Sequence, residues 1–218
     1  MFSFTYFGYA AILVQLEKHL LFDPGIIDGK PLVDVTKVHP AYVLVSQTSS
    51  EHIGNASEFP RKQGSLIIGT VQVLDLIRKA GVAGYAVAEL KNNETKQLGG
   101  NIQLTGYLLR RSGFLASRSL AFEVKSTQGC ITYLGKAKEI GPFTDTQPDL
   151  LCVAVGDKLG GSLSPEEAVK VTQAIDPRYA LPICGNALQR TRYITLIQAS
   201  GSATTPINLQ MGDTFTLL

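Results

Sequence analysis

Apolar residues come in short runs through the first part of the chain, and their spacing predicts strands. Residues 2–7 and 11–16 are rich in β-branched and aromatic residues and are separated by Gly8. Residues 20–22 form a third apolar run, closed by the turn sequence Asp23-Pro24-Gly25. Residues 42–45 are apolar without interruption, which is typical of a strand buried on both faces.

Helical patterns follow this last strand. Residues 53–59 predict a short helix that Pro60 ends, and residues 66–68 predict another strand. Thr70 is placed to cap a longer helix that ends at Gly81. The buried stripe expected for that helix consists of Val73, Leu74 and Ile77, with Val71 beside them. The alternation indicates a β-α-β layer.

The second half repeats this order of strands and helices. Strands are predicted at residues 102–105, 119–125, 130–134, 150–155, 179–183, 194–199 and 214–217. Ser164-Pro165-Glu166-Glu167-Ala168 predicts the start of a helix that runs to about residue 175, because serine caps, proline suits the first turn and Glu167 can complete a capping box. Two blocks of strands followed by helices fit an α/β sandwich with outer helices, although periodicity alone leaves other α/β layouts open.

Composition narrows the function classes. With 218 residues, 44% of them hydrophobic, the chain can bury a large core, and one domain over residues 1–218 is expected. The net charge of +2 and the scattered basic residues give no support to nucleic-acid binding. No apolar run reaches membrane-spanning length, and the first residues lack the basic start of a signal peptide, so a cytoplasmic location is expected. Three cysteines without a CxxC pair indicate neither a disulfide framework nor a structural zinc site.

The chemistry is expected in the loop Ser46-Gln47-Thr48-Ser49-Ser50-Glu51-His52, which comes directly after the apolar run 42–45. A loop between a buried strand and a helix is where α/β proteins commonly place reactive groups, because the sheet fixes its backbone while its side chains face a cleft.

The order of several motifs resembles the metallo-β-lactamase superfamily, and within it the branch of predicted metal-dependent hydrolases that includes the ascorbate-phosphate lactonases. The matching segments are Thr5-Tyr6-Phe7-Gly8-Tyr9-Ala10-Ala11-Ile12-Leu13, Leu21-Phe22-Asp23-Pro24, Glu51-His52-Ile53-Gly54-Asn55-Ala56, Gln147-Pro148-Asp149-Leu150-Leu151, Ser164-Pro165-Glu166-Glu167-Ala168 and Leu181-Pro182-Ile183-Cys184. The resemblance covers essentially the whole chain. It implies a four-layer αββα sandwich, and for typical members two divalent zinc or manganese ions that activate water.

The chain departs from that pattern at most of the implied metal-ligand positions. Gln47 and Ser49 stand where the first two histidines are expected, and Glu51 replaces an aspartate, while His52 is kept. The remaining positions carry Lys136 for the bridging aspartate, Cys184 for the last histidine, Tyr9 for the histidine of Gly-His-Ser, and Leu109 as the best match for a missing histidine. Only Glu51, His52 and Cys184 could bind a transition metal well, and the ammonium of Lys136 opposes a cation. We therefore expect neither metal nor cofactor.

Three functions remain open. The first is a noncatalytic protein, a pseudo-enzyme that binds a small molecule or a partner in a cleft formed by Tyr9, Gln47, Ser49, Glu51, His52, Lys136 and Cys184. The alternative is a metal-dependent hydrolase of the lactonase-like branch with an altered or single-metal site. The third is a metal-free enzyme using Cys184, Lys136 or Tyr9, with His52 as the base for a Cys184 nucleophile. An ion pair between Lys136 and Glu51 is expected to fill the former metal position, and the apolar composition is compatible with a homo-oligomer.

Other candidates have ordinary structural interpretations. His19 and His39 are expected at the surface, Cys152 as an inert buried thiol, Asp23 as a turn residue and Asp157 in a loop beside the cleft.

Overall fold

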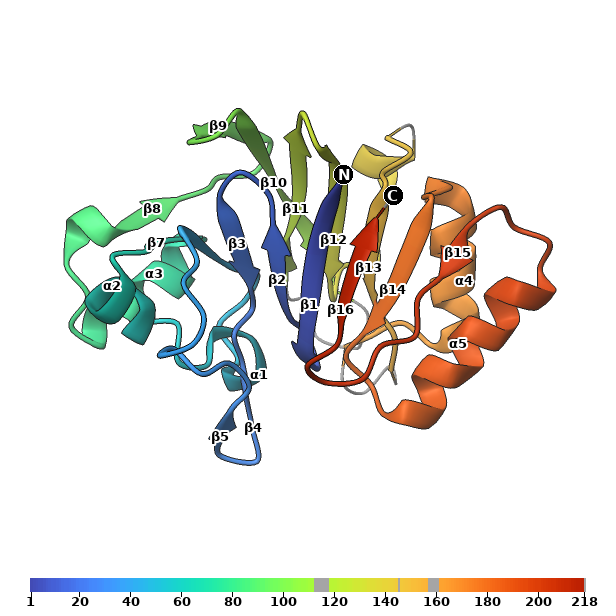
Figure 1. Cartoon of the computed structure of the whole chain (residues 1–218), viewed down its shortest axis with the longest axis horizontal. Coiled ribbons are helices and arrows are strands. Elements are labelled where there is room, and N and C mark those ends of the chain that lie inside the picture. The colour runs from blue at the N-terminus through green and yellow to red at the C-terminus, as the bar shows by residue number, and fades with distance from the viewer. Residues whose placement is uncertain (112–117, 145, 157–160, 218) are drawn as a thin grey trace.

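The computed structural model describes residues 1–111, 118–144, 146–156 and 161–217 (Figure 1). Within these ranges two seven-stranded sheets face each other. The first sheet has the order β16 (Thr214–Leu217), β1 (Phe2–Gly8), β2 (Ala11–Gln15), β3 (His19–Phe22), β6 (Tyr42–Val45), β7 (Leu66–Gly69) and β8 (Val87–Glu89). The second has the order β15 (Thr205–Pro206), β14 (Tyr179–Ile183), β13 (Leu150–Ala154), β12 (Gly129–Gly135), β11 (Arg118–Ser126), β10 (Ile102–Arg110) and β9 (Glu94–Leu98). A small hairpin pairs β4 (Ile26–Ile27) with β5 (Lys30–Pro31).

Each sheet is parallel in one half and antiparallel in the other. The strands β3, β6, β7 and β8 pair in parallel, as do β12, β13, β14 and β15. Parallel strands need crossover connections, which here carry the helices α1 (Ser50–Ile53), α2 (Glu58–Gln63), α3 (Val71–Lys79), α4 (Pro165–Ile175) and α5 (Ala187–Ala199). Loops at the carboxyl ends of parallel strands are the usual place for ligands in open α/β sheets.

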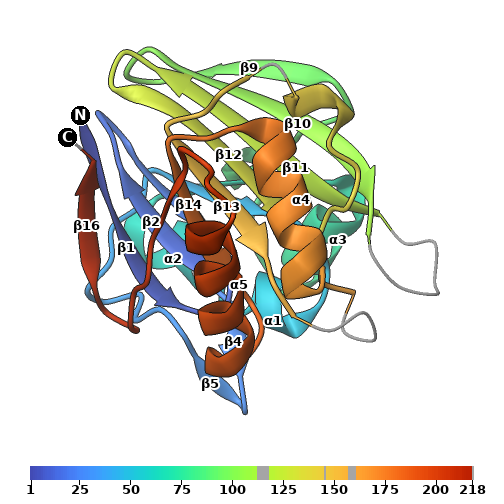
Figure 2. The same cartoon turned by 90° about the vertical axis from the view of Figure 1, so that its right-hand side faces the viewer.

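Among the described residues, three groups of buried side chains hold the layers together. The aromatic rings of Phe22, Phe122 and Tyr133 contact one another between the sheets, and the Phe22 and Tyr133 rings stack with centroids 4.7 Å apart. The outer face of the first sheet packs against α2 and α3, and that of the second against α4 and α5. Figures 1 and 2 show these helices outside the two sheets. The predicted four-layer αββα sandwich is therefore confirmed.

Local signals placed two helix starts correctly. Ser164 and Glu167 form the predicted capping box, in which the Glu167 amide donates to Ser164 Oγ at 3.3 Å and the Ser164 amide donates to Glu167 Oε2 at 3.0 Å. Thr70 caps α3 through a 3.5 Å bond from the Val73 amide. The buried stripe of α3 also matches the prediction, except that Val71 is 42% exposed.

The prediction of a strand at residues 194–199 is wrong, because these residues form the second half of α5. The β-branched residues in this segment favour extended backbone locally. The helix is set instead by its start, where Asn186 and Gln189 form a capping box, and by the burial of Tyr193, Ile194 and Ile197 along one face.

The single helix predicted at residues 53–59 is also wrong, because two short helices replace it. The first, α1, begins at Ser50 and ends before Gly54, whose φ is +44°. The second, α2, passes through Pro60, which is tolerated because it lies in the first turn, where a missing N–H breaks no helical bond. Among the described residues, no helix is both long and apolar enough to cross a membrane.

Candidate functional site

A buried carboxylate organises the site at the carboxyl ends of β3 and β6. Asp23 directly follows β3 and is fully buried. Its Oδ1 accepts a 2.7 Å hydrogen bond from the Ser46 amide, and its Oδ2 accepts a 2.6 Å bond from the Ser46 hydroxyl. Because β3 and β6 pair in parallel, the residues that follow them meet at the same edge of the sheet.

The same carboxylate orients an imidazole and a phenol. His52 Nδ1 lies 2.6 Å from Asp23 Oδ2, and the Tyr133 hydroxyl donates to that oxygen at 2.6 Å. Burial alone would raise the pKa of Asp23, but His52 and the hydrogen bonds from Ser46 bring it below its ordinary value. Burial, followed by the charge of Asp23, raises the pKa of Tyr133 well above its ordinary value. Tyr133 therefore donates to a carboxylate that stays ionised.

The expectation that Asp23 is only a turn residue is therefore incomplete. Its φ of +41° does fit a turn, but its side chain is a central acceptor of the site. Its position between a buried strand and a proline was the available signal. The sequence reasoning also missed Tyr133, which reaches the site from the opposite sheet.

Two residues with strained backbone join the sheets beside this network. Tyr9 and Cys184 have φ of +50° and +60°, a region that residues other than glycine rarely adopt. The Cys184 amide donates to the Tyr9 carbonyl at 2.6 Å. The Leu120 amide likewise donates to the Ser46 carbonyl at 2.9 Å, again from one sheet to the other. Such strained residues often occur at functional sites.

Four of the predicted cleft residues come together here. The Tyr9 and His52 rings meet edge to face with centroids 5.6 Å apart, and Lys136 Nζ lies 5.5 Å from the centre of the Tyr9 ring. Lys136 follows β12 and is buried, and Cys184, which follows β14, is fully buried. Residues far apart in the sequence therefore meet in one cluster between the two sheets.

Glu51 is partly buried in the first turn of α1, next to His52. The direct ion pair predicted between Glu51 and Lys136 is not among the ion pairs between described residues. Instead, the pKa of Glu51 is lowered first by its own backbone N–H at the start of α1 and, more weakly, by the positive charge of Lys136. The positive charge of Lys136 therefore favours the ionised form of Glu51.

Gln47 and Ser49 line a neighbouring polar cavity of about 410 Å³. The cavity is also lined by Thr70 at the start of α3, by Leu108, and by Arg111 and Arg118. Sequence reasoning missed both arginines as site residues, because they lie far from the polar loop in the chain. Leu109, the expected position of a missing histidine, packs into the core beneath α4 and α5 instead of lining the cavity.

The resemblance implies two metal ions at this site, which would need several nitrogen, oxygen or sulfur donors. One ring nitrogen of the buried His52 is already hydrogen-bonded to Asp23. The ammonium of Lys136 lies over the ring of Tyr9, which in turn packs against the ring of His52. The described residues contain no group of three or more His, Cys, Asp or Glu side chains that could hold a metal ion. Because Lys136 places a positive charge beside Tyr9 and the described residues form no such donor group, the described part of the site does not fit a dinuclear centre.

The chemistry of Cys184 does not favour a nucleophile. Burial raises the pKa of its thiol to about 12, even though the nearby charge of Lys136 acts in the opposite direction. Among the hydrogen bonds between described residues, none joins Cys184 to His52, whose Nε2 has no partner. A reactive thiol needs the thiolate form.

Three of the remaining candidates match their structural interpretations. His19 and His39 are exposed, as predicted. Cys152 is buried, and burial raises the pKa of its thiol strongly. Asp157 lies outside the described residues.

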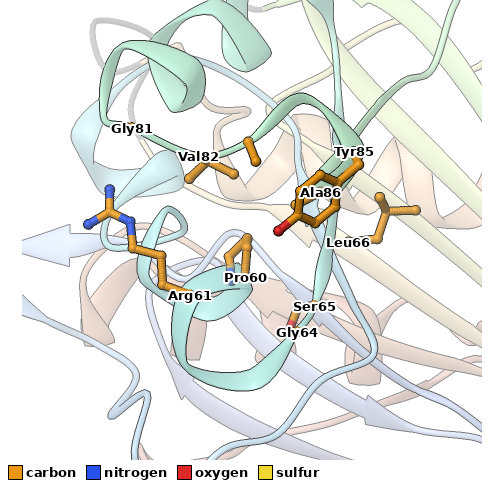
Figure 3. Close-up of a pocket in the computed structure, with 10 residues that line it drawn as sticks. Pro60, Arg61, Gly64, Ser65, Leu66, Gly81, Val82, Tyr85 and Ala86 are labelled. Carbon is orange, nitrogen blue, oxygen red and sulfur yellow. The ribbon is translucent and has the colours of Figure 1, made fainter.

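A second cavity lies at the opposite edge of the first sheet (Figure 3). Its lining includes Leu66, at the start of β7, and residues of the segment before β8. One of these residues, Tyr85, is 91% exposed. Its position at the amino ends of these parallel strands places it away from the network around Asp23. Ligands of open α/β sheets bind at the carboxyl ends, so this cavity is the weaker candidate.

Comparison with known proteins agrees with this architecture. A family model described as a beta-lactamase superfamily domain matches residues 3–184. A protein from Methanosarcina mazei named as a metal-dependent hydrolase is 27% identical over 206 residues, covering 86% of this chain and 85% of that protein. A protein of the same name from Enterococcus faecalis is 25% identical over 203 residues, covering 81% of this chain and 83% of that protein.

Solved structures share the fold at low sequence identity. A metallo hydrolase from Ignicoccus hospitalis superposes with a TM-score of 0.80 at 14% identity, covering 100% of this chain and 99% of the other. An isothiocyanate hydrolase from Delia radicum gut bacteria gives a TM-score of 0.76 at 14% identity, covering 99% of this chain and 98% of the other. These likenesses concern the arrangement of the sheets and helices.

Proposed function

Because this chain belongs to the beta-lactamase superfamily, with the metallo-β-lactamase fold, we propose that it uses the family's cleft to bind a small molecule without two metal ions. The scaffold and the position of the cleft are kept, while the chemistry of the cleft side chains is different. Binding in place of catalysis is the function that these side chains support best, since a fold alone does not fix an activity.

One observation supports this proposal most strongly. Lys136 is buried in the cleft, 5.5 Å from the ring centre of Tyr9, at the position where the resemblance implies a bridging aspartate. Two unit charges of equal sign repel by about 4 kcal/mol at about 4 Å and an effective dielectric near 20. A lysine in place of the aspartate removes a negatively charged ligand and adds a positive charge at the same position. Both changes lower the affinity of the site for a divalent ion.

Metal content tests the proposal directly. Protein purified without chelator is analysed for zinc, manganese and iron, and we expect well under one equivalent in total. The matched control restores donors in a single chain through Gln47→His, Ser49→His, Lys136→Asp and Cys184→His. If this variant gains metal while the natural chain does not, the missing ligands explain the difference. One or more equivalents of tightly bound metal in the natural chain would overturn the proposal.

A second candidate is a metal-dependent hydrolase with an altered or single-metal site. The names of the relatives from Methanosarcina mazei and Enterococcus faecalis favour it, since both are called metal-dependent hydrolases. His52 Nε2, which is buried without a hydrogen-bond partner, is the strongest donor available for such an ion. Hydrolysis of lactone or phosphodiester test substrates that requires added metal and is lost in His52→Ala would establish this alternative. Activity retained in His52→Ala would exclude His52 as the ligand.

A further inference from the structure

We propose that the polar cavity beside the cleft binds an oxyanion, the phosphate or carboxylate group of a small molecule, between Arg111 and Arg118. The inference rests on the proposed function, because this anion would belong to the molecule that the cleft holds. It adds the chemical class of the ligand. Three features of the cavity support it: a buried amide without hydrogen-bond partners, two guanidinium groups, and the N-terminal end of a helix.

The buried amide is that of Gln47. Its side chain lines the cavity and is only 6% exposed, and neither its Oε1 nor its Nε2 has a hydrogen-bond partner. Burying an amide without partners costs free energy, so buried polar side chains are nearly always bonded to protein or to a bound molecule. Gln47 therefore provides an unused donor and acceptor at the wall of the cavity.

The two arginines supply the charge. Arg111 Nε is buried without a hydrogen-bond partner, and Arg118 takes part in none of the ion pairs between described residues. The described residues that line the cavity include no aspartate or glutamate. Guanidinium groups bind phosphate and carboxylate through two parallel N–H bonds, so an oxyanion would satisfy donors that the protein leaves open.

The N-terminal end of α3 adds to the positive electrostatic potential of the cavity. Thr70 and Gln72, at the N-cap and in the first turn of this nine-residue helix, line the cavity. The N-terminal end of a helix carries partial positive charge and unpaired amide donors. Thr70 and Gln72 therefore place the N-terminal end of α3 at the same cavity as the arginines. The volume of about 410 Å³ suits a small molecule.

Anion titration tests the inference. The full chain is titrated with inorganic phosphate, and separately with acetate, against chloride at matched ionic strength, and binding is followed by calorimetry and by the melting temperature. We expect saturable binding of at least one oxyanion. Arg111→Gln should weaken it about tenfold, which corresponds to the loss of one charge-assisted contact. Phosphate binding alone points to a phosphorylated ligand, and acetate binding alone points to a carboxylate.

Arg110→Gln is the matched control, because Arg110 is the neighbouring arginine and pairs with Glu139 at the surface. It should leave the affinity unchanged. Arg118→Gln, at an exposed position where folding is not at risk, should weaken binding several-fold. Equal losses in Arg110→Gln and Arg111→Gln, or no response beyond chloride in the natural chain, would overturn the inference.

A chelator separates this inference from the proposed function. Phosphate binding that persists after EDTA treatment, in protein without metal, supports both. If the purified protein contains metal and phosphate binding persists after EDTA has removed it, the oxyanion site is supported and the metal-free function is overturned. Binding that disappears with EDTA shows that a metal holds the anion, and it overturns both.

Discussion

At the scale of single residues, Asp23 holds the site together. Its carboxylate is bonded to Ser46, His52 and Tyr133, which come from both sheets. The sequence predicted its turn but not its burial, because burial depends on the pairing of β3 with β6 and on Tyr133 from the other sheet. Local patterns carry no information on contacts of that range.

Asp23→Asn should destabilise the fold by about 2 to 4 kcal/mol, because a buried network loses its charged acceptor. The pKa of Asp23 is lower in the folded chain than the unfolded value of about 3.9, so its ionised form stabilises the fold above that pH. This contribution is lost as the pH falls through the folded-state pKa. Urea unfolding between pH 3 and pH 7 should show a weaker acid dependence in the variant. Asp75→Asn, at an exposed carboxylate in a surface ion pair with Arg78, is the control and should change stability little.

The cleft residues show what a resemblance can add to local patterns. Composition and spacing alone would not have grouped Tyr9, His52, Lys136 and Cys184, yet the structure brings them into one cluster. The arginines of the neighbouring cavity were missed, because nothing near Arg111 and Arg118 in the sequence marks them as site residues.

At the scale of elements, α1 is held by contact between two glycines. A side chain on Gly54 would overlap the backbone of Gly25, and both residues have positive φ. The Gly25 amide also donates to the His52 carbonyl at 3.2 Å, so this contact fixes the helix that carries Glu51 and His52. The sequence suggested a turn at Gly25 but gave no sign of the contact with Gly54.

Gly54→Ala should therefore cost several times more stability than Gly64→Ala, measured by chemical denaturation. Gly64 also has positive φ, +71°, but nothing lies within 4 Å of the position of its missing side chain. Its substitution should cost about 1 to 2 kcal/mol, the strain of a left-handed residue alone. Equal losses in the two variants would show that the Gly25 contact is unimportant.

The role of the capping box in forming α5, where the sequence predicted a strand, can be measured. If the capping box at Asn186 sets the helix, Asn186→Ala should destabilise the protein by about 1 kcal/mol. Asn186→Ser keeps a capping oxygen and should be close to neutral in the same thermal or urea unfolding measurement. A neutral Asn186→Ala would mean that packing of Tyr193 and Ile197 is sufficient to form α5.

At the scale of the whole molecule, the sandwich was the most predictable feature. Strand and helix patterns that recur in both halves indicated an α/β sandwich, and the resemblance to the metallo-β-lactamase superfamily selected the four-layer αββα layout that periodicity alone had left open. The same sandwich encloses two of the three cysteines, Cys152 and Cys184, while Cys130 is partly exposed. Burial raises the pKa of Cys130 to about 11 and that of Cys184 to about 12. All three should therefore be protonated at neutral pH.

Thiol labelling of the native protein at pH 7.5 should accordingly be slow and begin at Cys130. Cys184 should react only when denaturant unfolds the chain, as followed by mass spectrometry of the labelled peptides. Cys130→Ser should remove the early labelling and leave the late labelling unchanged. Labelling of native Cys184 faster than free cysteine would instead support a catalytic thiol.

The hydrogen bonds from Cys184 to Tyr9 and from Leu120 to Ser46 connect the two sheets beside the network around Asp23. Separating the sheets there would disrupt the cleft and the central core together. Deuterium should therefore replace the amide hydrogens of Cys184 and Leu120 only at the rate of global unfolding. A ligand would then bind to a preformed site, and no slow conformational change would limit its association rate.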